Sequence, residues 1–270
     1  MTVRYSQNSA NHYNASMNNG LDYRQQVAAL NQWFETDLGQ MVLEQESHVL
    51  QQLTQNLFGY YLLELGLLCR HPDYMQSSPI RNFVRAGPCH DEGSELVALP
   101  EQLPLVSDYI DAVVLPHTLD YVLDPRQVLR EVERILIPEG RVVIVGFNPY
   151  SLWGLWRMMP GSGKHLPWKG HFIPYARLQD WLSLLGFDVE QTRTLLFRPP
   201  WKKAFLKQRF PGLDRAGQRF CPWFAGVYVI VAVKRVSTLT PIRSRWRLER
   251  KLRNVVTQPI TNCSQGKLKE

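Results

Sequence analysis

The sequence predicts an open α/β sheet of the nucleotide-binding type, and two apolar runs carry most of this prediction. Residues 109–115 (YIDAVVL) and 141–147 (RVVIVGF) are short and continuously apolar, which is typical of parallel strands buried on both faces. An amphipathic helix is expected between them. A strand–helix–strand unit with the usual right-handed connection places its two strands in parallel.

The expected helix has a clear beginning and a clear period. Asp124 is suited to the N-cap, and Pro125 to the first helical position. Apolar side chains then recur at helical spacing, at Val128, Leu129, Val132, Ile135 and Leu136. The Pro-Glu-Gly sequence at 138–140 predicts a turn, in which Gly140 lets the chain leave the helix.

Five more apolar segments complete a sheet of seven strands. They predict strands over residues 60–66, 82–85, 95–99, 187–197 and 225–234. A helix is expected over 178–185, closed by Gly186, and two N-terminal helices are expected over 22–57, interrupted near Gly39. The expected organisation is a disordered segment (1–20), a domain (21–235, with helices over 21–58 and the sheet core over 60–235) and a basic, largely unstructured tail (236–270).

Several short motifs in this order resemble one enzyme family. They are Leu103-Pro104, the DxV of 111–113, His117 followed by Asp124-Pro125, LREVERIL, PEG and RVVIVG. Together they resemble class I S-adenosylmethionine-dependent methyltransferases, most closely the type-11 methyltransferase family. The likeness covers about residues 60–235 and is strongest over 98–150. It implies a Rossmann-like sheet of seven strands with the last antiparallel, S-adenosylmethionine as cofactor, and transfer of a methyl group to an acceptor.

The resemblance also implies which residues bind the cofactor. Glu64, Gly66 and Leu67 correspond to the acidic residue and glycine turn after the first strand, near the methionine end of the cofactor. Leu99 and Pro100 follow the third strand and would lie near the adenine. Leu115 and His117, at the end of the fourth strand, would lie beside the transferred methyl group.

Two positions depart from the family pattern. Leu68 replaces the second glycine of the turn, where a side chain would crowd a ligand lying against the backbone. The second strand ends in Arg85-Ala86-Gly87-Pro88, whereas family members carry an acidic residue there that holds the ribose hydroxyls. Asp91 or Glu92 could replace that acid. A fold relative that has lost cofactor binding therefore remains an alternative to a working enzyme.

His117 is the candidate catalytic residue. An imidazole titrates near pH 6.5, so it could remove a proton from a substrate hydroxyl or amine. The alternative is a histidine that packs on the cofactor or on Tyr121. By contrast, Asn148-Pro149-Tyr150 follows the fifth strand and is interpreted as a turn.

Residues 151–168 gather tryptophan, leucine and methionine at the expected ligand edge. They suit a lid over an apolar small-molecule acceptor, a membrane-surface contact, or a short helix packed in the core. The acceptor itself is not identified by the sequence.

The charge is unevenly distributed along the chain. Residues 193–253 hold 16 Lys+Arg against Asp214 and Glu249, whereas the first 192 residues hold 13 Lys+Arg against 21 Asp+Glu. Trp201, Lys202, Lys203 and Lys207 interleave aromatic and basic side chains. The second functional hypothesis is therefore an inactive methyltransferase-fold protein that binds RNA or an anionic surface through residues 193–253. A solvated tail is the simpler interpretation.

Composition argues against several other classes. The four cysteines form no CxxC pair, and His71, Cys89, His90 and Asp91 lack a metal-ligand spacing, so no metal site is expected. No apolar run reaches the roughly 20 residues that span a bilayer, and the N-terminus lacks the apolar core of a secretory signal. A cytoplasmic protein is expected.

Overall fold

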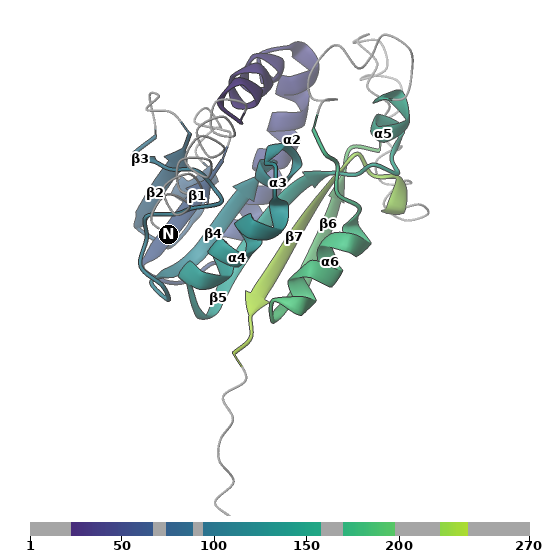
Figure 1. The fold of residues 1–270 in the computed structure, drawn as a ribbon. Helices are drawn as coiled ribbons and strands as arrows, with labels where there is room; N and C mark the ends of the chain where they lie inside the picture. Colours follow the sequence, from purple (N-terminus) through teal and green to yellow (C-terminus); the bar gives the residue numbers. More distant parts are fainter. Residues whose placement is uncertain (1–22, 67–73, 89–93, 158–169, 198–221, 237–270) are drawn as a thin grey trace, which may run out of the picture. The chain divides into compact units, whose positions relative to one another are not determined.

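A seven-stranded sheet forms the centre of the computed structural model, which describes residues 23–66, 74–88, 94–157, 170–197 and 222–236 (Figure 1). The strand order is β3-β2-β1-β4-β5-β7-β6. The first five strands pair in parallel, and β7 runs antiparallel to both of its neighbours. The bounds are β1 Tyr61–Leu65, β2 Asn82–Gly87, β3 Leu96–Val97, β4 Ile110–Pro116, β5 Leu136–Phe147, β6 Phe187–Leu195 and β7 Val227–Lys234. The predicted fold class, including the antiparallel last strand, is confirmed.

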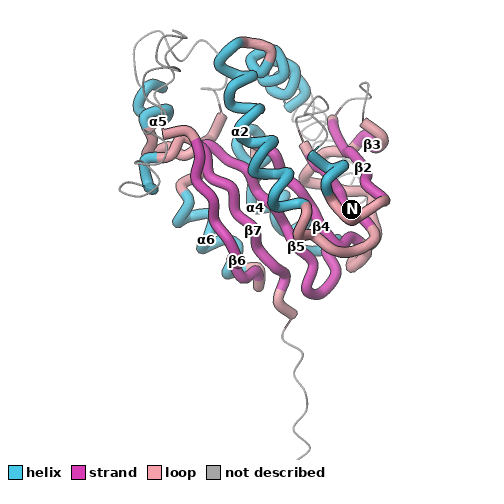
Figure 2. Tube along the Cα trace, turned by 180° about the vertical axis from the view of Figure 1, so that it is seen from behind, coloured by secondary structure: helices cyan, strands magenta, loops and turns pink. Residues whose placement is uncertain are grey.

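Helices cover both faces of the sheet. The helices are residues 23–34, α2 (Asp37–Thr54), α3 (Thr118–Tyr121), α4 (Pro125–Ile135), α5 (Leu152–Arg157) and α6 (Tyr175–Leu184), with 3₁₀ turns η1 (Tyr74–Ser77) and η3 (Pro222–Phe224). Helix α2 crosses one face, and α4 and α6 pack on the other (Figures 1 and 2). No helix within the described ranges is long and apolar enough to span a membrane.

The two expected N-terminal helices are present, but they separate before Gly39. Thr36 is the N-cap of α2, and its hydroxyl accepts a hydrogen bond from Gly39 N at 3.2 Å. Gly39 itself lies in the first turn of α2, where a Cβ atom would collide with the backbone of Trp33 and Phe34. The glycine therefore permits close packing of the two helices, and it does not break them.

The Pro-Glu-Gly sequence lies inside β5, which begins at Leu136 without a separate turn. The pairing of β5 with β4 shifts between Ile110 and Ala112, so the extra residues form a bulge. Glu139 takes the left-handed conformation there, at φ 65°. The prediction that Gly140 makes the turn is wrong in this detail. A Cβ atom on Gly140 would lie 2.8 Å from Ile137 O within the bulge and 3.1 Å from Asp111 O on β4, so the glycine is needed for both close contacts.

The tryptophan-rich segment starts with the short helix α5. Trp153 is fully buried and stacks with Phe147, at 6.4 Å between ring centroids, whereas Leu152 and Leu155 are exposed. This part fits the interpretation as a short helix packed in the core, and residues 158–169 lie outside the described ranges. Asn148 caps a turn, because its Oδ1 accepts from Tyr150 N at 3.1 Å.

Candidate active site

The carboxyl ends of β1, β2, β4 and β5 meet at one edge of the sheet, which is the edge where open α/β sheets bind ligands. The residues that follow these strands are Gly66, Pro88, His117 and Asn148. His117 is the polar group at the centre of this edge, and its surroundings define the candidate site.

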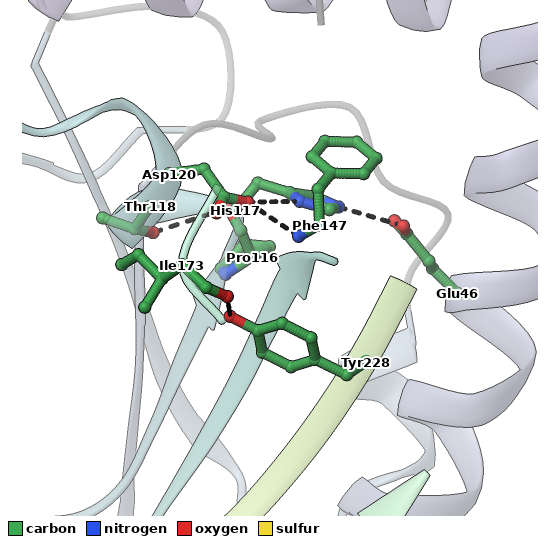
Figure 3. Close-up of polar contacts among 8 residues, drawn as sticks. All are labelled: Glu46, Pro116, His117, Thr118, Asp120, Phe147, Ile173 and Tyr228. Carbon is green, nitrogen blue, oxygen red and sulfur yellow. Dashed lines mark hydrogen bonds and ion pairs between the residues drawn. The ribbon is translucent and has the colours of Figure 1, made fainter. Parts of the chain in front are cut away.

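His117 joins two carboxylates that come from different helices (Figure 3). Its Nε2 lies 2.9 Å from Glu46 Oε1 on α2, and its Nδ1 lies 3.1 Å from Asp120 Oδ2 on α3. The ring stacks on Phe147 at a centroid distance of 4.1 Å. The backbone at His117 is left-handed, with φ 52°, which turns the chain from β4 into α3. All three polar side chains are buried.

This arrangement holds a proton on the imidazole. Burial by itself would lower the pKa of His117, but the charges and hydrogen bonds of Glu46 and Asp120 outweigh it and raise the pKa to about 9. The ring is thus an imidazolium at neutral pH, and both nitrogens donate to carboxylates. An imidazolium has no lone pair with which to take a proton, so a catalytic base would require the neutral form of the ring. The assignment of His117 as a catalytic base stays a prediction.

Asp120 is the most constrained carboxylate of the site. Its Oδ2 accepts from His117 Nδ1 and also from Phe147 N at 3.0 Å. Its Oδ1 is buried and has no hydrogen-bond partner within the described part of the chain. Burial raises the pKa of Asp120, against the opposing effect of His117. Burial and, secondly, the charge of Asp120 raise the pKa of the nearby Tyr228 phenol well above its ordinary value.

Gly66 directly follows β1 and has φ 136°, a conformation that favours glycine. Thr118 covers it: the Thr118 hydroxyl donates to Leu65 O at 2.5 Å, and a Cβ atom on Gly66 would overlap Thr118 Oγ1. The glycine predicted from the family turn is therefore required here by a contact with α3.

Glu64 is buried between two partners on neighbouring elements. Its Oε1 accepts from Tyr74 Oη at 2.8 Å, and its Oε2 accepts from Arg85 Nε at 3.2 Å. Burial, followed by the charge of Glu64, raises the pKa of Tyr74 well above its ordinary value. Glu64 thus ties β1 to β2 and to η1, immediately before the expected cofactor turn.

The other predicted cofactor residues lie along the same edge where they are described. Leu99 and Pro100 follow β3, and Leu115 is fully buried in β4, two residues before His117. Leu67, Asp91 and Glu92 fall outside the described ranges, as do Trp201, Lys202, Lys203 and Lys207.

The residue types agree with the family's cofactor pattern at two of its three places. Gly66 is a glycine, although Thr118 Oγ1 already occupies the side that a Cβ atom would take, and the apolar Leu99 and Pro100 follow β3. The third place, at the end of β2, holds Gly87 and Pro88 where an acid is expected, so the ribose contact is absent from the described residues.

Sequence reasoning missed Glu46, Thr118 and Asp120. A signal for Glu46 was present, because it interrupts the buried stripe of α2 formed by Val42, Leu50 and Leu53. A carboxylate at such a position needs a buried partner. Asp120 lies three residues after His117, a spacing that brings two side chains together in a helical turn.

No group of three His, Cys, Asp or Glu side chains within the described ranges could hold a metal ion. A hollow of about 290 Å³ lies between the end of α2 and the strands β5, β6 and β7, lined by residues that include Asn56, Arg141 and Glu190. Arg141 lies six residues before the carboxyl end of β5 at Phe147, so this hollow is away from the candidate site.

Known proteins share both the sequence pattern and the fold. The family described as "Methyltransferase domain" matches residues 76–144. Uncharacterized protein YafS of Escherichia coli (strain K12) is 31% identical over 165 residues, which cover 61% of this chain and 68% of that relative. The chain belongs to the class I methyltransferase family. The cofactor of this family is S-adenosylmethionine, in agreement with the prediction.

Further proteins are similar to this chain in sequence or in fold. Uncharacterized protein Rv2003c of Mycobacterium tuberculosis is 30% identical over 187 residues, which cover 64% of this chain and 62% of that protein. Among solved structures, geranyl diphosphate C-methyltransferase from Streptomyces coelicolor, in complex with Mg²⁺, geranyl diphosphate and S-adenosyl-L-homocysteine, matches with a TM-score of 0.52. It is 15% identical, and the match covers 75% of this chain and 85% of that one. This structural likeness shows the fold.

Proposed function

We propose that the chain transfers the methyl group of S-adenosylmethionine to a small-molecule acceptor at the carboxyl edge of the sheet. The observation that carries the proposal is the position of His117, with its two carboxylate partners, immediately after β4 in a sheet with the strand order of this family. Burying charged side chains costs free energy, so a buried polar cluster is expected where the geometry of a site must be held rigidly.

Within this proposal the cofactor residues keep the roles that the family pattern implies. Glu64, Gly66 and Leu67 would hold the methionine end, and Leu99 with Pro100 would contact the adenine. Leu115 and His117 would lie beside the methyl group. The ion pair of Glu64 with Arg85 fixes the ends of β1 and β2 relative to each other. An acid from residues 89–93 would serve the ribose.

The bound cofactor would supply an activated methyl group on a sulfonium, so the protein's main contribution is alignment. The buried network of Glu46, His117 and Asp120 would provide this alignment by fixing the strand ends at the site. Asp120 accepts from both His117 and the backbone of Phe147, which fixes the end of β4 against the end of β5. Glu46 fixes the same point against α2.

The acceptor would be an apolar small molecule that enters between residues 151–168 and 198–224. Support comes from exposed apolar side chains on described parts of these segments: Leu152, Leu155, Trp223 and Phe224. The structural relative in complex with geranyl diphosphate also supports a small-molecule acceptor. The cytoplasmic location stays a prediction.

Isothermal titration calorimetry with S-adenosylmethionine and S-adenosylhomocysteine tests the proposal. We expect micromolar binding to the wild type and at least tenfold weaker binding to Gly66→Ala. Gly186→Ala is the matched control, because it places a Cβ atom at another positive-φ glycine (φ 79°), at the end of α6. It should bind the cofactor normally. Absence of binding to the folded wild type at millimolar ligand would overturn the proposal.

A further inference from the structure

Asp120 Oδ1 is a buried acceptor that has no hydrogen-bond partner among the residues the structure describes. A buried polar atom without a hydrogen bond costs about 1–3 kcal/mol, so such atoms in native proteins usually have a ligand, a water or a function. The atom belongs to a side chain with no exposed surface, in the turn directly after β4. The arrangement around Oδ2 leaves no freedom to turn Oδ1 toward another partner, because Oδ2 is held by His117 and by Phe147 N.

The charges around this atom are unbalanced. Two carboxylates, Glu46 and Asp120, share the single positive charge of His117. From the other elements packed on Asp120 come the phenol of Tyr228 on β7 and the backbone of His171, which donates to Asp120 O at 2.6 Å. Neither brings a positive charge close to Oδ1. A ligand that carries both a hydrogen-bond donor and a positive charge would complete the cluster.

We infer that Asp120 Oδ1 is a binding point for the methyl acceptor and that the acceptor group it takes is an amine. This deepens the proposed function and rests on it. Asp120 is the binding residue, since its Oδ1 accepts a hydrogen bond from the protonated amine. For methyl transfer the bound ammonium would give one proton to this oxygen, which restores the nitrogen lone pair that takes the methyl group of the sulfonium. His117 and Glu46 are positioning residues, which hold the carboxyl plane through Oδ2.

Residues 170–173 pack against the backbone of Asp120 and against Tyr228. His171 N donates to Asp120 O, and Tyr228 Oη donates to Ile173 O at 3.0 Å. A Cβ atom on Gly170 would lie 2.9 Å from Asp120 O, so the backbone contacts the aspartate directly.

The test uses the full-length protein and three probes of equal chain length: hexylamine, 1-hexanol and hexanoate. Binding is followed by the NMR signals of the Phe147 backbone amide and of the His117 ring, both of which touch the Asp120 carboxyl group. We expect hexylamine to shift both signals saturably and to bind at least tenfold more tightly than 1-hexanol. Hexanoate should not bind at this site.

Asp120→Asn provides the matched variant. Its amide oxygen can still accept from His117 and Phe147, which places the amide nitrogen, a donor, where Oδ1 was. Hexylamine affinity should then fall at least tenfold, while hexanoate gains affinity. Glu46→Gln should weaken hexylamine binding less than Asp120→Asn does, because it removes a nearby negative charge but leaves the acceptor atom Asp120 Oδ1 in place.

Hexylamine that shifts neither signal in the wild type would overturn the inference, and so would equal affinities for hexylamine and hexanol. A bound water at Oδ1 would then be the partner of this atom. The wild-type shifts decide the question even if Asp120→Asn does not fold. Cofactor titration keeps the two proposals apart: cofactor binding without an amine response rejects this inference and leaves the methyltransferase proposal standing.

Discussion

Glu46 Oε1 lies 2.9 Å from His117 Nε2 and joins α2 to the end of β4 across 71 positions of sequence. Both side chains are almost completely buried. In such a site a charge without a partner is costly, whereas a complete pair can be accommodated. The pair therefore couples the attachment of the N-terminal helix to the geometry of the candidate active site.

Removing one partner of this pair should destabilise the fold strongly. Glu46→Ala leaves the buried His117 cation with Asp120 alone, and the free energy of unfolding should fall by about 3–5 kcal/mol. Urea denaturation measures this change. Glu44→Ala, on the exposed face of the same helix, should change it by no more than about 0.5 kcal/mol. Equal effects of the two substitutions would contradict the buried ion pair.

The raised pKa of His117 predicts a pH dependence of stability. The folded protein holds the proton with a pKa of about 9, against about 6.5 in the unfolded chain. The stabilisation is therefore complete below about pH 6.5 and is lost as the pH rises through 9. It amounts to roughly 3 kcal/mol.

Urea unfolding at pH 6, 7.5 and 9 measures this loss against His117→Asn. Asparagine tolerates the left-handed backbone at this position and does not titrate. The wild type should lose stability relative to the variant over this range. Parallel pH profiles would mean that the pKa of His117 is the same in the folded and the unfolded protein, and they would contradict the raised pKa.

The sheet was predicted well from the sequence because each strand is recognisable from the apolar pattern of its own residues. The runs that form β4 and β5, and the Asp124 cap of α4, are decided by residues next to one another. The bulge at Glu139 was not predictable in this way, since it depends on how β5 pairs with Asp111 and its neighbours on β4. Pro138 and Gly140 indicated a turn before the strand, whereas in the structure both residues lie inside β5 and form part of the bulge.

The candidate site was predicted only in part. His117 and Gly66 follow strands that were recognised, so their position at the sheet edge could be expected. The partners of His117 could not, because Glu46 belongs to a helix 71 positions away and its docking is a tertiary contact. Similarly, the role of Gly66 depends on Thr118, which a comparison with the family turn does not reveal.

Gly66 and Thr118 should be energetically coupled. Gly66→Ala places a side chain at φ 136° and against Thr118 Oγ1, which should cost at least about 2 kcal/mol. Thr118→Ala removes the hydrogen bond to Leu65 O and should cost about 1 kcal/mol. A double-mutant cycle should give a double variant less destabilised than the sum, by about 1 kcal/mol. Strict additivity would show that the two residues do not touch.

Two tryptophans near the carboxyl edge should behave differently. Trp153 is fully buried on α5, whereas Trp223 in η3 is 84% exposed. Trp153→Ala should lower the free energy of unfolding by about 3–5 kcal/mol, and Trp223→Ala by no more than about 0.5 kcal/mol. Thermal or urea unfolding measures both. A small effect at Trp153 would argue that α5 is not part of the core.

Hydrogen exchange with and without S-adenosylhomocysteine tests the location of the cofactor most directly. The account predicts that bound ligand slows amide exchange in peptides at the carboxyl ends of β1 and β4, which contain Gly66 and His117, and leaves the hollow near Asn56 and Glu190 unchanged. Protection confined to that hollow, or no protection at saturating ligand, would contradict a methyltransferase site at this edge of the sheet.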